Sequence, residues 1–221
     1  MGFSRLASTR GTLTTLTLLG LVALPQAAQA QLFSLDDGTA EQSLGLSGGG
    51  TLTWGNHFVS AGATSITSIQ VAFGAPASPN PSQNGLAVTL RLFLDPTNNS
   101  NPNDATLLAS AAGVIASEAT NTFIDYPIAP TALAAGAHFY AVVTTTHLAG
   151  QFPAAQDNSS DSSDSLIAVG SDFTTATPIG GLGFPGRWML RAVGSTSAPE
   201  PGTLALLALG IAGGIAIKRR K

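Results

Sequence analysis

Two polar runs of the chain carry oxygen side chains at alternate positions, which is the ligand type that calcium prefers. The first run covers residues 95–104 (DPTNNSNPND) and the second covers 157–164 (DNSSDSSD). Neither run has the glycine at position six and the glutamate at position twelve that an EF-hand loop requires. Asx turns that cap a solvated loop are the alternative interpretation of the same residues. If an ion binds, we expect its first ligands to be Asp95, Asn99 and Asp104.

Residues suited to catalysis are few. The histidines His57, His138 and His147 share no metal-ligand spacing, and we expect them in loops or half-buried on strands. His138 and Tyr140 are two apart and fall on the same face of one strand. The chain has no cysteine, which excludes disulfides, thiolate metal sites and a cysteine nucleophile. We therefore predict a protein that is not an enzyme and that needs no cofactor, with calcium as the alternative.

Two further groups of residues keep alternatives open. The early acids at 36, 37 and 41 would suit a glycan hydrolase if two carboxylates came to the required separation. Trp54 and Trp188 could stack on sugar rings if they lay on an exposed sheet face, although a domain of this size needs most of its aromatics in the core. A carbohydrate-binding module is therefore the alternative function, and a glycan hydrolase is a more remote one.

The charges are segregated along the chain. Of the 221 residues, 44% are hydrophobic and 10% charged, with a formal net charge of −3. All twelve acidic residues but only three of the nine basic ones lie between residues 31 and 200, which gives that segment a net charge of −9. An acidic segment of this kind excludes a nucleic-acid binder with a basic face. It would also be repelled by an acidic polysaccharide unless cations bridged the two.

The first 30 residues have the three parts of a secretory signal peptide. Arg5 and Arg10 form a positive start, and residues 13–24 (LTTLTLLGLVAL) form an apolar stretch. Ala28 and Ala30 supply small residues at the −3 and −1 positions of a cleavage site. We predict export by the general secretion machinery, with the mature protein beginning at Gln31.

The last 24 residues carry a second targeting pattern. Pro199, Glu200 and Pro201 precede the apolar stretch 204–217 (LALLALGIAGGIAI). The chain then ends in a basic cluster, Lys218, Arg219, Arg220 and Lys221. Fourteen apolar residues rise about 21 Å as a helix, which is short for a bilayer span but extendable at both ends. Basic residues beyond an apolar stretch stay in the cytoplasm, so the acidic domain would lie outside.

This tail resembles the PEP-CTERM sorting signal of Gram-negative bacteria, in which Pro-Glu-Pro, a short apolar segment and a basic cluster follow one another at the C-terminus. The resemblance covers residues 198–221. It implies recognition by an exosortase, a membrane-embedded enzyme, with removal of the tail. An inner-membrane intermediate would then lead to the cell surface or to an exopolysaccharide matrix.

Between the two signals, residues 31–197 are long enough for one domain with a core. Residues 86–94 alternate apolar and polar, and similar runs occur at 69–73, 139–145 and 188–193. Shorter candidates lie at 52–54, 107–110, 123–126 and 166–169, and the connecting stretches are rich in Gly, Pro and Asn. We predict an all-β fold, a single antiparallel β-sandwich or jelly roll, with at most one helical turn at 132–137.

The segments 36–41 (DDGTAE) and 48–56 (GGGTLTWGN) are similar to the start of a sandwich domain common among PEP-CTERM proteins. That similarity implies a relation in fold and no assigned reaction. The sequence as a whole therefore predicts a secreted, non-catalytic protein of the cell surface or the exopolysaccharide matrix.

Overall fold

The computed structural model describes residues 29–77, 81–159 and 163–196. In the described part of the chain, helix is limited to the 3₁₀ segments η1 (Pro102–Asp104), η2 (Phe173–Thr175) and η3 (Ile179–Leu182), and none is long and apolar enough to cross a membrane. The strands are β1 (Ala30–Phe33), β2 (Gln42–Leu44), β3 (Gly49–Val59), β4 (Thr64–Val71), β5 (Ala87–Asp95), β6 (Thr106–Val114), β7 (Ile124–Leu133), β8 (His138–Leu148), β9 (Ala154–Asp157), β10 (Ser165–Val169), β11 (Thr177–Pro178), β12 (Arg187–Trp188) and β13 (Leu190–Thr196).

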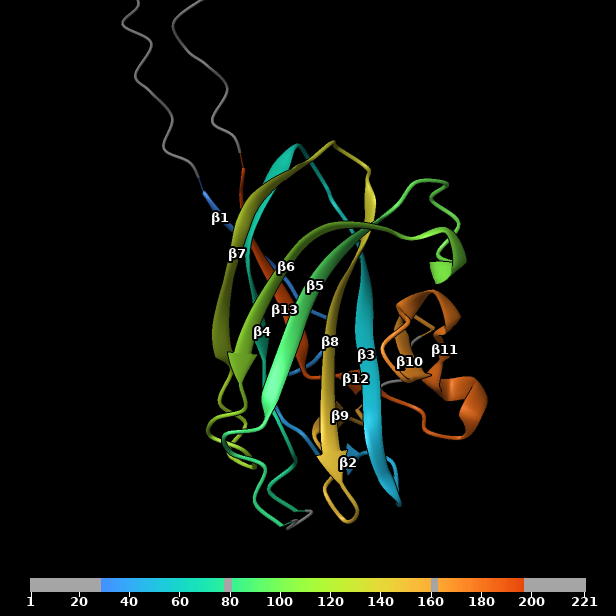
Figure 1. Ribbon diagram of the computed structural model, residues 1–221. Coiled ribbons are helices and arrows are strands. Elements are labelled where there is room, and N and C mark those ends of the chain that lie inside the picture. The colour runs from blue at the N-terminus through green and yellow to red at the C-terminus, as the bar shows by residue number, and fades with distance from the viewer. Residues whose placement is uncertain (1–28, 78–80, 160–162, 197–221) are drawn as a thin grey trace, which may run out of the picture. The chain divides into compact units, whose positions relative to one another are not determined.

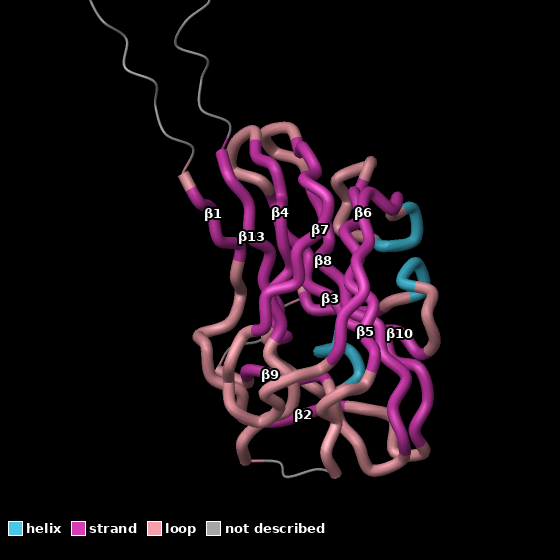
Figure 2. Tube along the Cα trace, turned by 60° about the vertical axis from the view of Figure 1, so that its left-hand side comes forward, coloured by secondary structure: helices cyan, strands magenta, loops and turns pink. Residues whose placement is uncertain are grey.

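The strands form two large sheets and one small one, and every pairing is antiparallel. The six-stranded sheet has the order β11-β10-β3-β8-β5-β6, and its long strands stand nearly side by side in Figure 1. The four-stranded sheet has the order β1-β13-β4-β7, and Figure 2 shows β1 lying along β13. A small sheet, β12-β9-β2, lies at one end. The predicted all-β, antiparallel class is confirmed.

One hydrophobic core is shared by the two large sheets. Leu52, Trp54 and Leu90 contribute to it from the six-stranded sheet, and Ile69 and Leu190 contribute from the four-stranded sheet. All five side chains are almost fully buried. Alternation explains this arrangement, because every second residue of a strand points to the same face.

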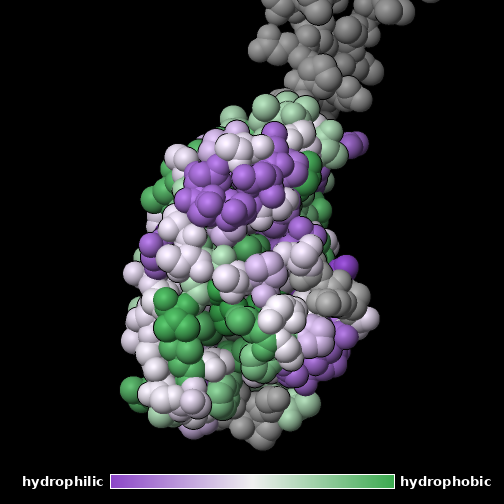
Figure 3. Space-filling model, turned by 90° about the vertical axis from the view of Figure 1, so that its right-hand side faces the viewer, coloured by the Kyte–Doolittle hydropathy of each residue, from purple (hydrophilic) through white to green (hydrophobic). Residues whose placement is uncertain are grey.

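The opposite face of the six-stranded sheet carries a second, smaller apolar cluster. Phe93 on β5 and Tyr140 on β8 pack there against Phe173 of η2. Figure 3 views the molecule from this side and shows hydrophilic residues gathered toward one end and an apolar patch toward the other. We call the face of the six-stranded sheet that carries Phe93 and Tyr140 its outer face. The candidate site described below lies on this face.

Several predicted elements differ in detail from the structure. The segment 188–193 is not one strand, because β12 ends at Trp188 and pairs with β9 while β13 begins at Leu190 and pairs with β4. Residues 132–137 form no helical turn: β7 continues to Leu133, and a turn leads directly into β8. Strand β3 is much longer than the predicted 52–54 because it pairs with β8 along eleven residues.

Candidate functional site

Histidine and carboxylate side chains gather on the outer face where three neighbouring strands meet. His57 lies on β3, His138 on β8 and Asp95 at the end of β5. The register places His138 opposite both Val59 and Asp95, and it places His57 opposite Tyr140. His57 and His138 are thereby brought into contact, although they lie 81 positions apart in the sequence. We call His57, Asp95, His138 and Asp164 the histidine cluster.

The two imidazole rings contact each other directly. Nε2 of His57 lies 3.1 Å from Nδ1 of His138, and the ring centroids are 5.0 Å apart. On its other side, Nδ1 of His57 lies 3.1 Å from Oδ1 of Asp164. His57 is 5% exposed and Asp95 is 1% exposed, whereas His138 is half-buried. One ligand atom from each of His57, Asp95 and His138 falls within 4.8 Å of the others, which is close enough for one metal ion.

The carboxylate of Asp95 is fixed by its own loop. Its Oδ2 accepts the backbone N–H of Ser100 at 2.8 Å, and its Oδ1 accepts the N–H of Thr97 at 3.1 Å. Burial alone would raise the pKa of Asp95, but hydrogen bonds from the N–H groups of residues 97, 99 and 100 and from the Thr97 hydroxyl outweigh it. The pKa is therefore lowered, and the side chain is held as an anion.

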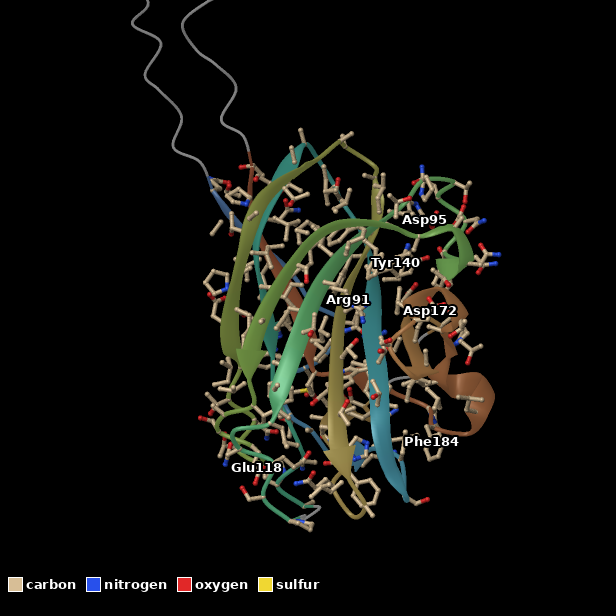
Figure 4. All side chains as sticks on the ribbon, viewed as in Figure 1. Arg91, Asp95, Glu118, Tyr140, Asp172 and Phe184 are labelled. Carbon is tan, nitrogen blue, oxygen red and sulfur yellow. The ribbon has the colours of Figure 1, made fainter. Side chains whose placement is uncertain are left out.

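The hydroxyl of Tyr140 lies among negatively charged side chains at this end of the sheet. Its hydroxyl lies 3.5 Å from Oδ2 of Asp95, and Figure 4 shows the two side chains at the same end of the outer face. Burial raises the pKa of the Tyr140 hydroxyl, and the negative charges of Asp95, Asp104 and Asp164 raise it further. Three carboxylates thus place negative charge around one buried hydroxyl beside the histidine cluster.

An open groove leads along the histidine cluster. It has a volume of about 470 Å³ and is lined by residues 31–35 of β1 and the following segment, by the end of β3, and by Asp164. His57 is among the lining residues, so solute can reach the cluster from this side. A second hollow of about 300 Å³ lies under the exposed side chains of Leu182 and Phe184 and is mostly apolar.

The predicted calcium loop is held together by its own hydrogen bonds. The side-chain oxygen of Asn99 accepts the N–H of Asn101 at 2.7 Å, and Oδ2 of Asp104 accepts the Thr97 hydroxyl at 2.7 Å. The bonds from the N–H of Thr97 to Asp95 and from the N–H of Asn101 to Asn99 are Asx-type turns, which stood as the alternative interpretation. Calcium binding by Asp95, Asn99 and Asp104 stays a prediction.

Neither tryptophan proposed for sugar stacking is accessible. Trp54 is 1% exposed and Trp188 is fully buried, and both belong to the core shared by the two large sheets. The indole N–H of Trp188 donates to the carbonyl of Leu166 at 2.8 Å, so its polar atom is also satisfied internally. The prediction of a sugar-binding platform at these residues is wrong, because both rings are needed to fill the core.

The early acids take part in two different arrangements. Asp36 has a fully buried side chain and forms an ion pair with Arg191 at 2.5 Å. Asp37 and Glu41 instead meet Asp157, with one oxygen of each within 4.8 Å of the others. Oδ2 of Asp157 accepts the N–H of Asp37 at 2.8 Å, and Glu41 accepts the N–H of Asn158 at 2.8 Å. The start of the second polar run therefore lies against the early acid segment.

The sequence did not predict the contact between His57 and His138. No spacing along one strand could reveal it, since the contact depends on the register between β3 and β8. His138 has the expected half-buried strand position, whereas His57 is more deeply buried than expected. His147 lies apart from them, and its Nε2 accepts the N–H of Leu46 at 3.2 Å.

The sorting residues predicted at Ala28, at 199–201 and at 218–221 lie outside the described residues. The predicted signal cleavage follows Ala30, the first residue of β1. Residues 197–221 match the family model described as the PEP-CTERM protein-sorting motif. No curated protein matches the chain. The motif implies processing by an exosortase, a membrane enzyme, and export toward the cell surface.

Proposed function

Since the chain ends in a PEP-CTERM sorting motif, we propose that it is a secreted, non-catalytic protein of the cell surface or of an exopolysaccharide matrix. The general secretion machinery would export it and remove residues 1–30. An inner-membrane intermediate, held by residues 204–217 and by the basic cluster 218–221, would present Pro199, Glu200 and Pro201 to the exosortase.

The observation that carries this proposal is the position of the motif relative to the fold. The last strand of the described residues, β13, ends at Thr196, and the motif begins at residue 197. All the pairings of β13, to β1 and to β4, are made upstream of that point. Cleavage within the motif would therefore release a domain that keeps every described strand.

A non-catalytic role is supported by what the early acids already do. Asp36 is committed to Arg191, whose guanidinium also lies 3.8 Å from the ring centroid of Phe123. Asp157 is buried and accepts the N–H groups of Asp37 and Ser159. These carboxylates stabilise loops, and such a role explains their clustering without a reaction.

Mass spectrometry of the exported protein tests the proposal. We expect material outside the cell to begin at Gln31 and to lack the basic cluster 218–221. The variant Glu200→Gln should accumulate in the membrane fraction with its tail intact. The matched control is Asp172→Asn, an acid-to-amide change on an exposed domain residue where asparagine can still cap η2, and it should be sorted normally. An intact tail on wild-type extracellular protein would contradict the proposal.

A further inference from the structure

We propose that the histidine cluster binds a divalent transition-metal ion of the zinc class, with His57, His138 and Asp95 as its ligands. Imidazole nitrogen and carboxylate oxygen are common ligands of such ions. The three residues come from β3, β8 and β5, which are adjacent strands of one sheet, so their backbones are fixed by pairing. The site is separate from the sorting motif and adds a ligand to the exported domain.

The separation of the two imidazole nitrogens fits one shared ion. Two nitrogens bound at about 2.05 Å to a tetrahedral zinc ion stand about 3.3 Å apart. Nε2 of His57 and Nδ1 of His138 are 3.1 Å apart, a separation close to that of two nitrogens that share one such ion. Asp95 completes the set, with a carboxylate oxygen within 4.8 Å of one ring nitrogen of each histidine.

Asp164 sets the tautomer that metal binding needs. A carboxylate can only accept a hydrogen bond, so the Nδ1 of His57 that faces Asp164 carries the proton. Nε2 of His57 then has a free electron pair and points toward His138. A carboxylate behind a histidine ligand is the usual outer partner in zinc sites, where it orients the ring.

The charges around the cluster would compensate a divalent ion. Asp95 is buried and held as an anion by its loop, and such outer hydrogen bonds are typical of a carboxylate that ligates a metal. Asp104 and Asp164 act electrostatically on the same Tyr140 hydroxyl as Asp95 does. One oxygen of Asp104, Oδ1, is buried and accepts no hydrogen bond from the described residues. The groove along His57 and Asp164 provides an entry path.

Calorimetric titration of the full chain with zinc chloride tests the proposal, using detergent-solubilised protein without a polyhistidine tag and treated first with a chelator. We expect one zinc ion per chain and a higher melting temperature with zinc, since an ion that binds only the folded state stabilises it. His138→Ala, at a half-buried position, should weaken zinc binding by at least ~100-fold. Asp164→Asn should weaken it by about 10- to 100-fold through loss of the outer partner.

The control variant is His147→Gln, which changes the histidine outside the cluster and should bind zinc like the wild type. Circular dichroism verifies that each variant is folded, and His138→Ala decides the question even if a variant at buried His57 fails to fold. The proposal is overturned if the wild type binds no zinc, or if His138→Ala binds it with unchanged affinity. It is also overturned if the protein takes up calcium but not zinc, since that result would assign the ion to the oxygen-rich 95–104 loop.

Discussion

Gly113 lies where the edge strands β6 and β7 of the two large sheets are in contact. It lies on β6, and a Cβ added there would stand 2.5 Å from Cδ1 of Tyr126 on β7. The Tyr126 ring is buried and its hydroxyl donates to the carbonyl of Val114 at 2.7 Å, so it cannot swing away without losing that bond. We expect Gly113→Ala to lower the free energy of unfolding by about 1–3 kcal/mol.

Chemical denaturation measures this effect, and Gly48→Ala is its matched control. Gly48 is exposed, and an added Cβ there would meet no atom within 4 Å. We expect the control to change the free energy of unfolding by less than about 0.5 kcal/mol. Equal effects of the two substitutions would mean that the contact with Tyr126 carries no special cost.

A pH dependence is expected at the Asp157 carboxylate. Burial alone would raise its pKa, but hydrogen bonds from Ser159 and Asp37 and the charge of Arg187 outweigh burial and lower it. The folded pKa thus lies below the unfolded value of about 3.9, so the charged form stabilises the fold above that pH. This contribution is lost as the pH falls through the lower, folded pKa.

Asp157→Asn should therefore be less stable than the wild type at pH 7, by about 2 kcal/mol, because hydrogen bonds to a charged acceptor are lost. The difference should shrink as the pH falls below about 4, where the wild-type carboxyl becomes protonated as well. Denaturation curves recorded between neutral and acidic pH measure it. A difference that stays constant over that range would contradict the role given to the charge.

Single residues were predicted from the sequence with uneven success. Trp54 and His57 differ by an odd number of positions, so they lie on opposite faces of β3, with Trp54 in the core and His57 on the outer face. The sequence could not assign those faces, because it predicted a strand over 52–54 and not the full length of β3. The histidine contact also requires the register of β3 against β8, which no local pattern encodes.

At the scale of elements, an ion pair links the segment after β1 to β13. Asp36 follows β1 and Arg191 lies on β13, and both Nε and Nη2 of Arg191 donate to Oδ1 of Asp36. Because the Asp36 side chain is fully buried, Asp36→Asn would leave the partly buried guanidinium of Arg191 without its counter-charge. We expect a loss of about 3–5 kcal/mol in the free energy of unfolding.

Hydrogen exchange locates the consequence of that substitution. The backbone amides of β1, which pairs with β13, should lose protection from exchange. The amides of β3 and β8, which pair with each other and not with β13, should lose less. Removing both charges, with Asp36→Asn and Arg191→Met, should recover part of the stability, since the uncompensated charge would be gone. If the double variant is less stable than the single one, the cost lies elsewhere than in the unpaired guanidinium.

The strand with the clearest alternation was predicted over nearly its full length, whereas several of the shortest strands were missed. The alternation at 86–94 corresponds to β5, where Val88, Leu90 and Leu92 face the shared core. Strands β1, β2 and β9 have three or four residues each and were not predicted. Their partners lie far away in the sequence, as in the pairing of Gln42 with Gln156, and so few residues carry no recognisable period of their own.

At the scale of the whole molecule, the two ends of the described domain lie together. Ala30 pairs with Ser195, and the N–H of Thr196 donates to the carbonyl of Gln29. The predicted signal cleavage after Ala30 and the sorting motif from residue 197 therefore act on neighbouring ends of one strand pair. Cleavage after Ala30 leaves residues 31–33 of β1 paired with β13.

This arrangement predicts that the fold does not depend on the sorting tail. β13 lies between β1 and β4, and its Leu190 and Ala192 are fully buried in the shared core. A chain that lacks residues 197–221 keeps all of those contacts, so we expect its melting temperature to equal that of the full chain. A chain that lacks residues 190–221 loses β13 and its buried side chains. Burial of each large apolar side chain contributes roughly 1.5–3 kcal/mol to the free energy of unfolding, so this chain should show no cooperative unfolding transition.

Thermal denaturation followed by circular dichroism compares the two truncations. A clear drop in melting temperature on removing 197–221 alone would show that the tail stabilises the domain, and the view of the tail as a removable sorting signal would then fail.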